Sequence, residues 1–196
     1  MGLTTKTQIK PDIVLYGGDI LERGRISKGK LLTFDKQLSS IKPNYGQFIV
    51  SGNHDPFRFS GYHKNSEITF LNDTLVKVAN SFYLIGLNYR SFSEKPIAKL
   101  MMLAKEDLPV ILLDHSPYQL ELASKNHIDI QLSGHTHNGQ VWPINYIVGL
   151  LYELPWGYKK INDLHVFVTS GIQGWGTPIR TAGKSEIMVI NVEFVN

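Results

Sequence analysis

Four short apolar runs, each ending in a polar tip, constrain the fold of this chain more than any other feature of its sequence. Each run is rich in Ile, Val, Leu and aromatic residues, as buried strands are. In open α/β sheets, ligands bind beyond the carboxyl ends of the strands. The pattern therefore predicts an α/β fold with one site at the tips of Ile13–Tyr16, Phe48–Ser51, Val110–Leu113 and Ile128–Leu132.

Amphipathic stretches separate these runs and complete the expected topology. Leu31, Phe34, Leu38 and Ile41 recur at helical spacing, and Pro43 would end that helix. We expect mixed sheets, because a hairpin accompanies the helix-linked strands. The further predicted elements are helices over Ile97–Lys105 and Tyr118–Lys125, a hairpin of Leu75–Ala79 with Phe82–Leu87, and strands over Leu164–Thr169 and Ile187–Phe194.

Length and composition indicate a single domain, residues 1–196. The chain is 42% hydrophobic and 19% charged, without repeats or linker-like blocks. Its apolar runs are shorter than the roughly 20 residues that a membrane-spanning helix needs. The net charge is only +3 and the basic residues are scattered, so the basic stripe of a dedicated nucleic-acid binder is absent. Because the chain has no cysteine, a metal would require nitrogen and oxygen ligands.

The strand tips carry a carboxylate, an amide and several imidazoles, a ligand set that suits Zn, Mn or Fe. An aspartate can also bridge two ions about 3.5–4 Å apart. Each signal alone has an ordinary reading, since an aspartate after a strand often caps a turn and a lone histidine is often a hydrogen-bonded core residue. Together, at successive strand ends, they predict a site built from Asp19, Asn53, His54, His115, His135 and His137. Surface or structural roles are expected for His63, His127 and His165.

The tip motifs GD, GNHD, DHSP and GHTHNGQ resemble those of the calcineurin-like metallophosphoesterase superfamily and occur in the family's order. The stretch from Val168 to Ile187 further resembles a branch of bacterial phosphoesterases that are often exported or membrane-associated. The resemblance implies a four-layer αββα sandwich of mixed sheets. It also implies two divalent ions, Mn, Zn or Fe, in the complete family site between the sheets.

The resemblance implies a role for each tip residue. Asp19 would bridge both ions, and His137 would belong to the second ion. His54 would lie beside the scissile phosphate and donate a proton to the leaving oxygen, with Glu22 as its acidic orienter. The first ion would be completed by Asn53, His115 and His135.

One departure from the family pattern concerns the start of the chain. The family begins with a strand ending in Asp-x-His, and no such motif precedes Ile13. Asp12 opens a strand at the wrong end, and Asp114 would point away from His115 if the strand continues. We therefore expect a domain that is N-terminally incomplete, lacks the first strand and holds one ion.

The segment VWPINYIVGLLYELPWGY, residues 141–158, is densely apolar and directly follows the last metal tip. It could pack as a loop over the core. Alternatively, it could form a wall or lid for an amphiphilic substrate, since exposed apolar patches mark binding surfaces. For substrate binding we assign Trp142 in this segment and Arg180 in the C-terminal stretch.

These observations favour hydrolysis of phosphate mono- or diesters by a metal-activated hydroxide, on a small-molecule, amphiphilic or lipid-linked substrate. The alternative is a catalytically impaired, single-metal or metal-free binding protein that retains the fold. The resemblance allows peripheral membrane contact, and the sequence leaves the location, the oligomeric state and the natural substrate open.

Overall fold

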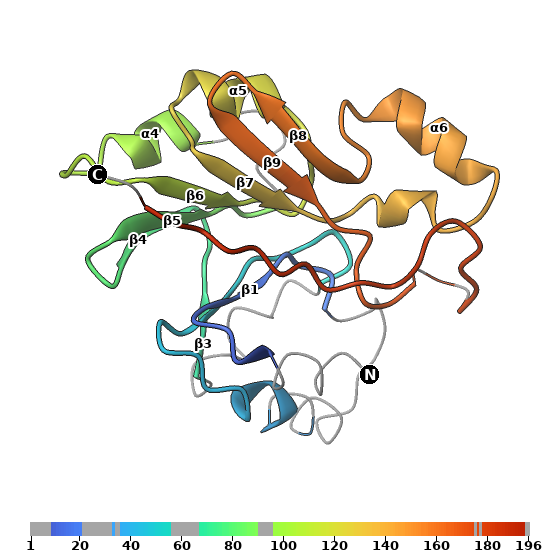
Figure 1. Ribbon diagram of the computed structural model, residues 1–196, viewed down its shortest axis with the longest axis horizontal. Coiled ribbons are helices and arrows are strands. Elements are labelled where there is room, and N and C mark those ends of the chain that lie inside the picture. The colour runs from blue at the N-terminus through green and yellow to red at the C-terminus, as the bar shows by residue number, and fades with distance from the viewer. Residues whose placement is uncertain are drawn as a thin grey trace.

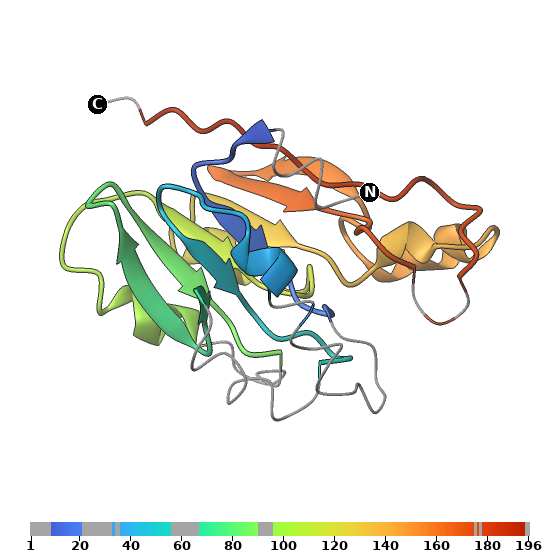
Figure 2. The same cartoon turned by 90° about the horizontal axis from the view of Figure 1, so that it is seen from below.

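Two stacked β-sheets form the centre of the molecule in a computed structural model (Figures 1 and 2). The structure describes residues 9–20, 33, 36–55, 67–89, 96–174, 176 and 178–194. The first sheet has the order β1-β2-β3, and its three strands are parallel. They are β1 (Val14–Tyr16), β2 (Gln47–Ile49) and β3 (Ile68–Phe70).

The second sheet is mixed and has the order β4-β5-β6-β7-β9-β8. Its four central strands are parallel, and an antiparallel pair closes each end. The predicted hairpin is confirmed as β4 with β5. The strands are β4 (Thr74–Val78), β5 (Phe82–Gly86), β6 (Val110–Leu113), β7 (Ile130–Ser133), β8 (Gly157–Ile161) and β9 (Leu164–Val168).

Helices cover the two outer faces, which confirms the four-layer αββα architecture (Figure 1). Helices α4 (Ile97–Met101) and α5 (Leu120–Lys125) pack on the second sheet through one buried cluster. A helical segment around Leu38 packs on the first sheet, and Ile41 joins it there. Leu31 and Phe34, predicted on the same helix, lie outside the described residues. A third cluster fills the space between the sheets, with Val50, Leu71, Leu84 and Leu113 among its members.

Two predicted elements differ from the structure at their ends. Helix α4 ends at Met101, four residues before the predicted end, and α5 begins at Leu120 because Gln119 adopts a left-handed conformation with φ 59°. The described residues contain no helix long and apolar enough to cross a membrane.

The predicted strand Ile187–Phe194 is wrong. This segment has no strand conformation, and most of its side chains from 189 onward are exposed. It runs as an irregular strap past β1 and β5, and Phe194 stacks on Phe82 with ring centroids 5.7 Å apart (Figure 1). The apolar side chains of this segment therefore do not take part in a sheet.

The apolar segment after the last metal tip forms a helix, α6 (Ile144–Leu151), that stands at the end of the molecule opposite α4 (Figures 1 and 2). None of the residues of α6 is buried, whereas Leu154, later in the same apolar segment, belongs to the core cluster of the second sheet. Asn145 and Val148 are the half-buried positions of the helix, and Tyr152, the residue after its last turn, is half-buried as well. Their spacings of three and four mark the face toward the protein. The outward face is apolar, with Leu150 at 88% exposure.

Candidate metal centre

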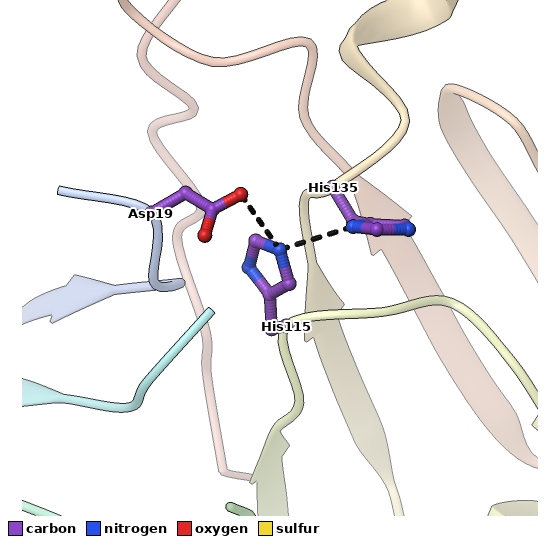
Figure 3. Close-up of side chains that lie close together, drawn as sticks. All are labelled: Asp19, His115 and His135. Atoms are coloured by element: carbon purple, nitrogen blue, oxygen red, sulfur yellow. Dashed lines mark hydrogen bonds and ion pairs between the residues drawn. The ribbon is translucent and has the colours of Figure 1, made fainter. Parts of the chain in front are cut away.

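Four side chains from four strand tips converge at the edge where the two sheets meet. Asp19 follows β1, Asn53 follows β2, His115 follows β6 and His135 follows β7. Nε2 of His115 lies 3.1 Å from Oδ2 of Asp19 and 3.1 Å from Nδ1 of His135 (Figure 3). It also lies 3.0 Å from Oδ1 of Asn53. Nδ1 of His135 is in turn 2.9 Å from Oδ1 of Asn53. The structure therefore brings together the residues expected to hold the first ion.

The donor set and spacing fit a divalent cation. Nitrogen and oxygen ligands about 2.0–2.2 Å from an ion in tetrahedral geometry lie about 3.4 Å apart, so these atoms need only small outward shifts. Oδ2 of Asp19 is buried and faces Nε2 of His115 at 3.1 Å. Ligating atoms of Asp19, His115 and His135 all lie within 4.8 Å of one another. A cation bound here would pair with this buried carboxylate oxygen.

His115 is oriented for coordination by the backbone of another tip. It is 2% exposed, and its Nδ1 lies 2.6 Å from the carbonyl oxygen of Gly17. Since a carbonyl can only accept, Nδ1 carries a hydrogen, so Nε2 presents its lone pair toward Asp19 and Asn53 whenever the ring is neutral. Such a partner on the far ring nitrogen commonly fixes the tautomer of a metal-binding histidine.

Asp55 organises the Asp19 tip, and sequence reasoning missed it. Its Oδ2 accepts hydrogen bonds from the backbone N–H groups of Asp19, at 2.7 Å, and Gly52, at 2.8 Å. Oδ1 of Asp19 accepts a further bond from the N–H of His54 at 2.6 Å. Asp55 is the last residue of the GNHD motif, so the motif could have pointed to it. No local pattern shows, however, that its carboxylate accepts hydrogen bonds from the residue after β1.

The loops after β1 and β2 approach each other so closely at Gly18 and Gly52 that neither position has room for a side chain. A Cβ at Gly18 would lie 2.6 Å from the nitrogen of Gly52 and 2.8 Å from Nδ1 of His115. A Cβ at Gly52 would collide with the carboxylate of Asp19. Gly18 also has φ 90°, which L side chains rarely adopt. Asp19 itself has φ 52°, so the ligand is held in an uncommon backbone conformation of the kind that clusters at functional sites.

The electrostatics of the cluster separate its two histidines. Burial, with the charge of His115 next, lowers the pKa of His135 to about 4, so this imidazole is neutral at pH 7. Burial also acts to lower the pKa of His115, but the hydrogen bond and charge of Asp19 outweigh it and raise that pKa above its usual value. Burial would raise the pKa of Asp19, but His115 and the N–H of His54 outweigh it, so this pKa is lowered. Asp19 is therefore ionised and available to a cation.

His137 is not part of the group formed by Asp19, His115 and His135. It opens a short 3-10 turn, η2 (His137–Gly139), and has φ 51°. Burial, followed by the charge of Arg180, lowers its pKa, so it too is neutral at pH 7. Asp19 and His115 also act on that pKa, which places His137 within electrostatic reach of the cluster.

The other expected site residues lie around this centre in different ways. His54 acts on the pKa values of Asp19 and His135, so it also lies within electrostatic reach. Trp142 is 65% exposed, and its backbone N–H donates to Oγ1 of Thr181. Glu22 lies outside the described residues.

Three tyrosines lie around His135, and sequence reasoning missed them. The ring centroids of Tyr89, Tyr118 and Tyr152 lie 5.8, 6.2 and 6.0 Å from that of His135. Tyr118 stacks on Tyr152 at 4.8 Å and donates a 2.7 Å hydrogen bond to its hydroxyl oxygen. Because Tyr152 caps the C-terminal end of α6, this pair connects the exposed helix to the metal centre.

An αββα sandwich with a carboxylate, an amide and two imidazoles at adjoining strand ends defines the class of metallophosphoesterase domains. The chain belongs to the calcineurin-like phosphoesterase family, whose model matches residues 4–139. One solved crystal structure, at 15% identity and a TM-score of 0.54, covers 85% of this chain and 81% of its own, and it supports the fold alone.

Relatives with curated names extend across nearly the whole chain. An uncharacterized metallophosphoesterase of Helicobacter pylori is 33% identical over 94% of this chain and 52% of its own length. One from Campylobacter jejuni is 28% identical over 97% of this chain and 53% of its own. A zebrafish (Danio rerio) protein named transmembrane protein with metallophosphoesterase domain is 28% identical over 92% of this chain and 45% of its own. The chain thus spans about half the length of these relatives.

Proposed function

We propose that this protein hydrolyses phosphate esters at a divalent metal centre held by Asp19, Asn53, His115 and His135, with His137 as a ligand of the second ion in the complete family site. The observation that carries the proposal is the convergence of four ligating atoms, with neighbours about 3 Å apart, from both sheets. When bound there, divalent ions supply a Lewis acid for the phosphoryl oxygens and lower the pKa of water toward 7. Mn, Zn and Fe all suit the donor set.

In this proposal, side chains beside the metal centre support its ligands and protonate the leaving oxygen of the ester. Asp55 and the N–H of His54 fix both the backbone and the carboxylate of Asp19, so the centre is preorganised. The imidazole of His54 donates a proton to the leaving oxygen, and Glu22 orients that imidazole. Monoesters and diesters both fit this scheme, because neither role depends on a second ester group.

An amphiphilic or lipid-linked ester is the substrate class that we propose. Helix α6 begins five residues after the η2 turn and presents exposed apolar side chains, including Trp142 just before it, while Tyr152 at its other end lies near His135. Such an apolar surface beside a phosphate site suits a substrate with a hydrocarbon chain and allows peripheral contact with a membrane. The zebrafish and cattle (Bos taurus) relatives are named transmembrane proteins, which supports the membrane context.

The proposal is tested by loading the purified chain with Mn²⁺ or Zn²⁺, measuring metal content, and assaying p-nitrophenyl phosphate and bis(p-nitrophenyl) phosphate. We expect hydrolysis of at least one ester. His54→Ala should lower kcat about 100-fold or more while metal content is retained, the usual scale for a positioned proton donor. A fully metal-loaded chain that cleaves neither ester would instead favour the alternative, a binding protein that retains the fold.

A further inference from the structure

The guanidinium of Arg180 is directed at backbone carbonyls. Nη1 donates to the carbonyl oxygen of His137 at 3.1 Å. Nη2 donates to the carbonyls of Ser170 at 2.9 Å and Gln173 at 3.0 Å. Arg180 thus ties the His137 tip to two points after the end of β9. Nε is also buried, so it is not presented to solvent where a substrate would arrive.

The tip that Arg180 holds has an unusual backbone. His137, Asn138, Gly139 and Gln140 have consecutive φ values of 51°, 52°, 69° and 53°. A non-glycine residue in the left-handed region costs on the order of 1–3 kcal/mol, and such a conformation persists only where its surroundings impose it. Three such residues within four positions therefore require external support.

The segment around Arg180 supplies that support. The carbonyl of Gln140 accepts hydrogen bonds from the N–H groups of Thr181 and Ala182, both at 2.9 Å. Nε2 of Gln140 donates to the carbonyl of Ile179 at 3.0 Å. Arg180 lies in sequence between Ile179 and Thr181, which both contact Gln140. Its own side chain contacts the first residue of the tip, His137.

Ser170 anchors the other end of the same clamp. It is 2% exposed, and its N–H donates to Oε1 of Glu186 at 2.8 Å while its carbonyl accepts from Arg180. Its hydroxyl donates to the carbonyl of Lys184 at 2.8 Å. Arg180 therefore connects the left-handed tip to a buried residue just after the end of β9.

We propose that Arg180 is a positioning residue that holds the backbone of His137, and with it the direction of the His137 imidazole, rather than a group that binds substrate. This inference rests on the proposed function for its meaning in catalysis, because His137 is the proposed ligand of the neighbouring ion. A lysine at this position could reach one of the three carbonyls but could not reproduce the planar fork that spans them.

The test records the histidine ring signals of the metal-free chain by NMR for wild type, Arg180→Gln, Arg180→Lys and Lys184→Gln. Lys184 is an exposed cation of the same segment and serves as the matched control. We expect the ring signals of His137 to shift or broaden in Arg180→Gln, less so in Arg180→Lys and not in Lys184→Gln. The signals of His115 should stay in place, because the carbonyl of Gly17 holds that ring independently.

A second readout separates positioning from substrate binding. Arg180→Gln should weaken binding of the ion that uses His137 about 10–100-fold, the usual effect of removing a supporting contact. It should lower kcat on a soluble phosphate ester and leave KM unchanged. A raised KM with unmoved His137 signals would assign Arg180 to substrate binding and overturn the proposal.

Equal shifts at His115 and His137, or loss of folding in both variants, would also overturn it, because Arg180 would then be a general stabilising residue. If Arg180→Gln alone fails to fold, the Arg180→Lys spectrum decides. The NMR measurement does not require an active enzyme. If the chain hydrolyses no ester but the His137 signals respond selectively, the proposed function is wrong and the role of Arg180 still holds.

Discussion

Nδ1 of His115 donates a hydrogen bond to the carbonyl oxygen of Gly17 at 2.6 Å, although 98 positions separate the two residues in sequence. Gly17 follows β1 of the first sheet and His115 follows β6 of the second, so this bond joins the tips of the two sheets. The same ring presents Nε2 to the proposed ion. Binding of the ion and packing of the sheets should therefore be energetically linked.

Replacing His115 with Ala should abolish stabilisation by metal. An ion that binds only the folded state adds about 2.7 kcal/mol at 100 times its Kd, and loss of one direct ligand should weaken binding by more than about 100-fold. Thermal unfolding with and without Zn²⁺ or Mn²⁺ measures this difference. His127→Asn is the control, because His127 is exposed and asparagine tolerates its φ of 56°. A metal-dependent rise in Tm that survives in His115→Ala would remove His115 from the centre.

Asp55→Ala should lower both stability and metal affinity. The change leaves the N–H groups of Asp19 and Gly52 without their acceptor, at a cost of about 1–3 kcal/mol for each group that stays buried. Metal affinity should fall about 10–100-fold because Asp19 loses its support. Asp129→Ala is a matched control, since its carboxylate accepts from the N–H of Val110 away from the site. Calorimetric titration should show that only Asp55→Ala changes affinity.

The metal centre could be predicted from sequence because each ligand directly follows an apolar strand, and parallel strands bring their carboxyl ends to one edge. Asp19, Asn53, His115 and His135 were found in this way. Asp55 and the tyrosines around His135 were not, because their contacts depend on how loops return in space. Tyr118 and Tyr152, for example, lie 34 positions apart and meet through the placement of α6.

The errors in fold prediction have related causes. The apolar residues of Ile187–Phe194 suit a strand, but strand formation also needs a neighbouring backbone, which no local pattern reports. The apolar segment that contains α6 was compatible with packing over the core or with an exposed wall, and the structure leaves this helix exposed. The hydrophobicity of a segment alone does not show whether its side chains are buried in the core or exposed on the surface.

Metal binding should release one proton per ion near pH 6, and this proton should come from His115. Its raised pKa means that the metal-free ring holds a proton there, whereas the pKa of His135, lowered to about 4, leaves that ring already neutral. Affinity should therefore rise about tenfold per pH unit and level off above the raised pKa of His115. Titration calorimetry in buffers of different ionisation enthalpy counts the protons. Release of two would show that His135 also competes for a proton.

Two glycine substitutions should have opposite effects. Gly52→Ala places a methyl group against the carboxylate of Asp19 and should cost at least about 1–3 kcal/mol, with loss of metal binding. Gly149→Ala lies in exposed α6, where an added Cβ meets no described atom within 4 Å, and should stabilise the helix by about 0.5–1 kcal/mol. Urea denaturation compares the two variants. Equal metal affinity in Gly52→Ala and wild type would contradict the close approach.

The exposed face of α6 should bind lipid, and Leu150→Glu should remove that binding. Leu150 is 88% exposed, and residues 141–152 contain no charged side chain. Met102 provides a matched control because it is 85% exposed, equally apolar and located just after α4 at the other end of the molecule. Wild type and Met102→Glu should sediment together with phosphatidylcholine–phosphatidylglycerol vesicles, whereas Leu150→Glu should stay in the supernatant. The measurement uses metal-free protein, so it does not depend on activity.

The same pair of variants tests whether lipid binding serves the substrate. Wild-type kcat/KM should increase with the chain length of an alkyl phosphate ester, by up to about 0.8 kcal/mol in transition-state stabilisation for each methylene buried. In Leu150→Glu this dependence should weaken, while cleavage of p-nitrophenyl phosphate stays unchanged because the metal centre is intact. Equal rates across chain lengths, together with vesicle binding, would make α6 a membrane anchor without a role in substrate choice. Vesicle binding that persists in Leu150→Glu would show instead that another surface contacts the lipid.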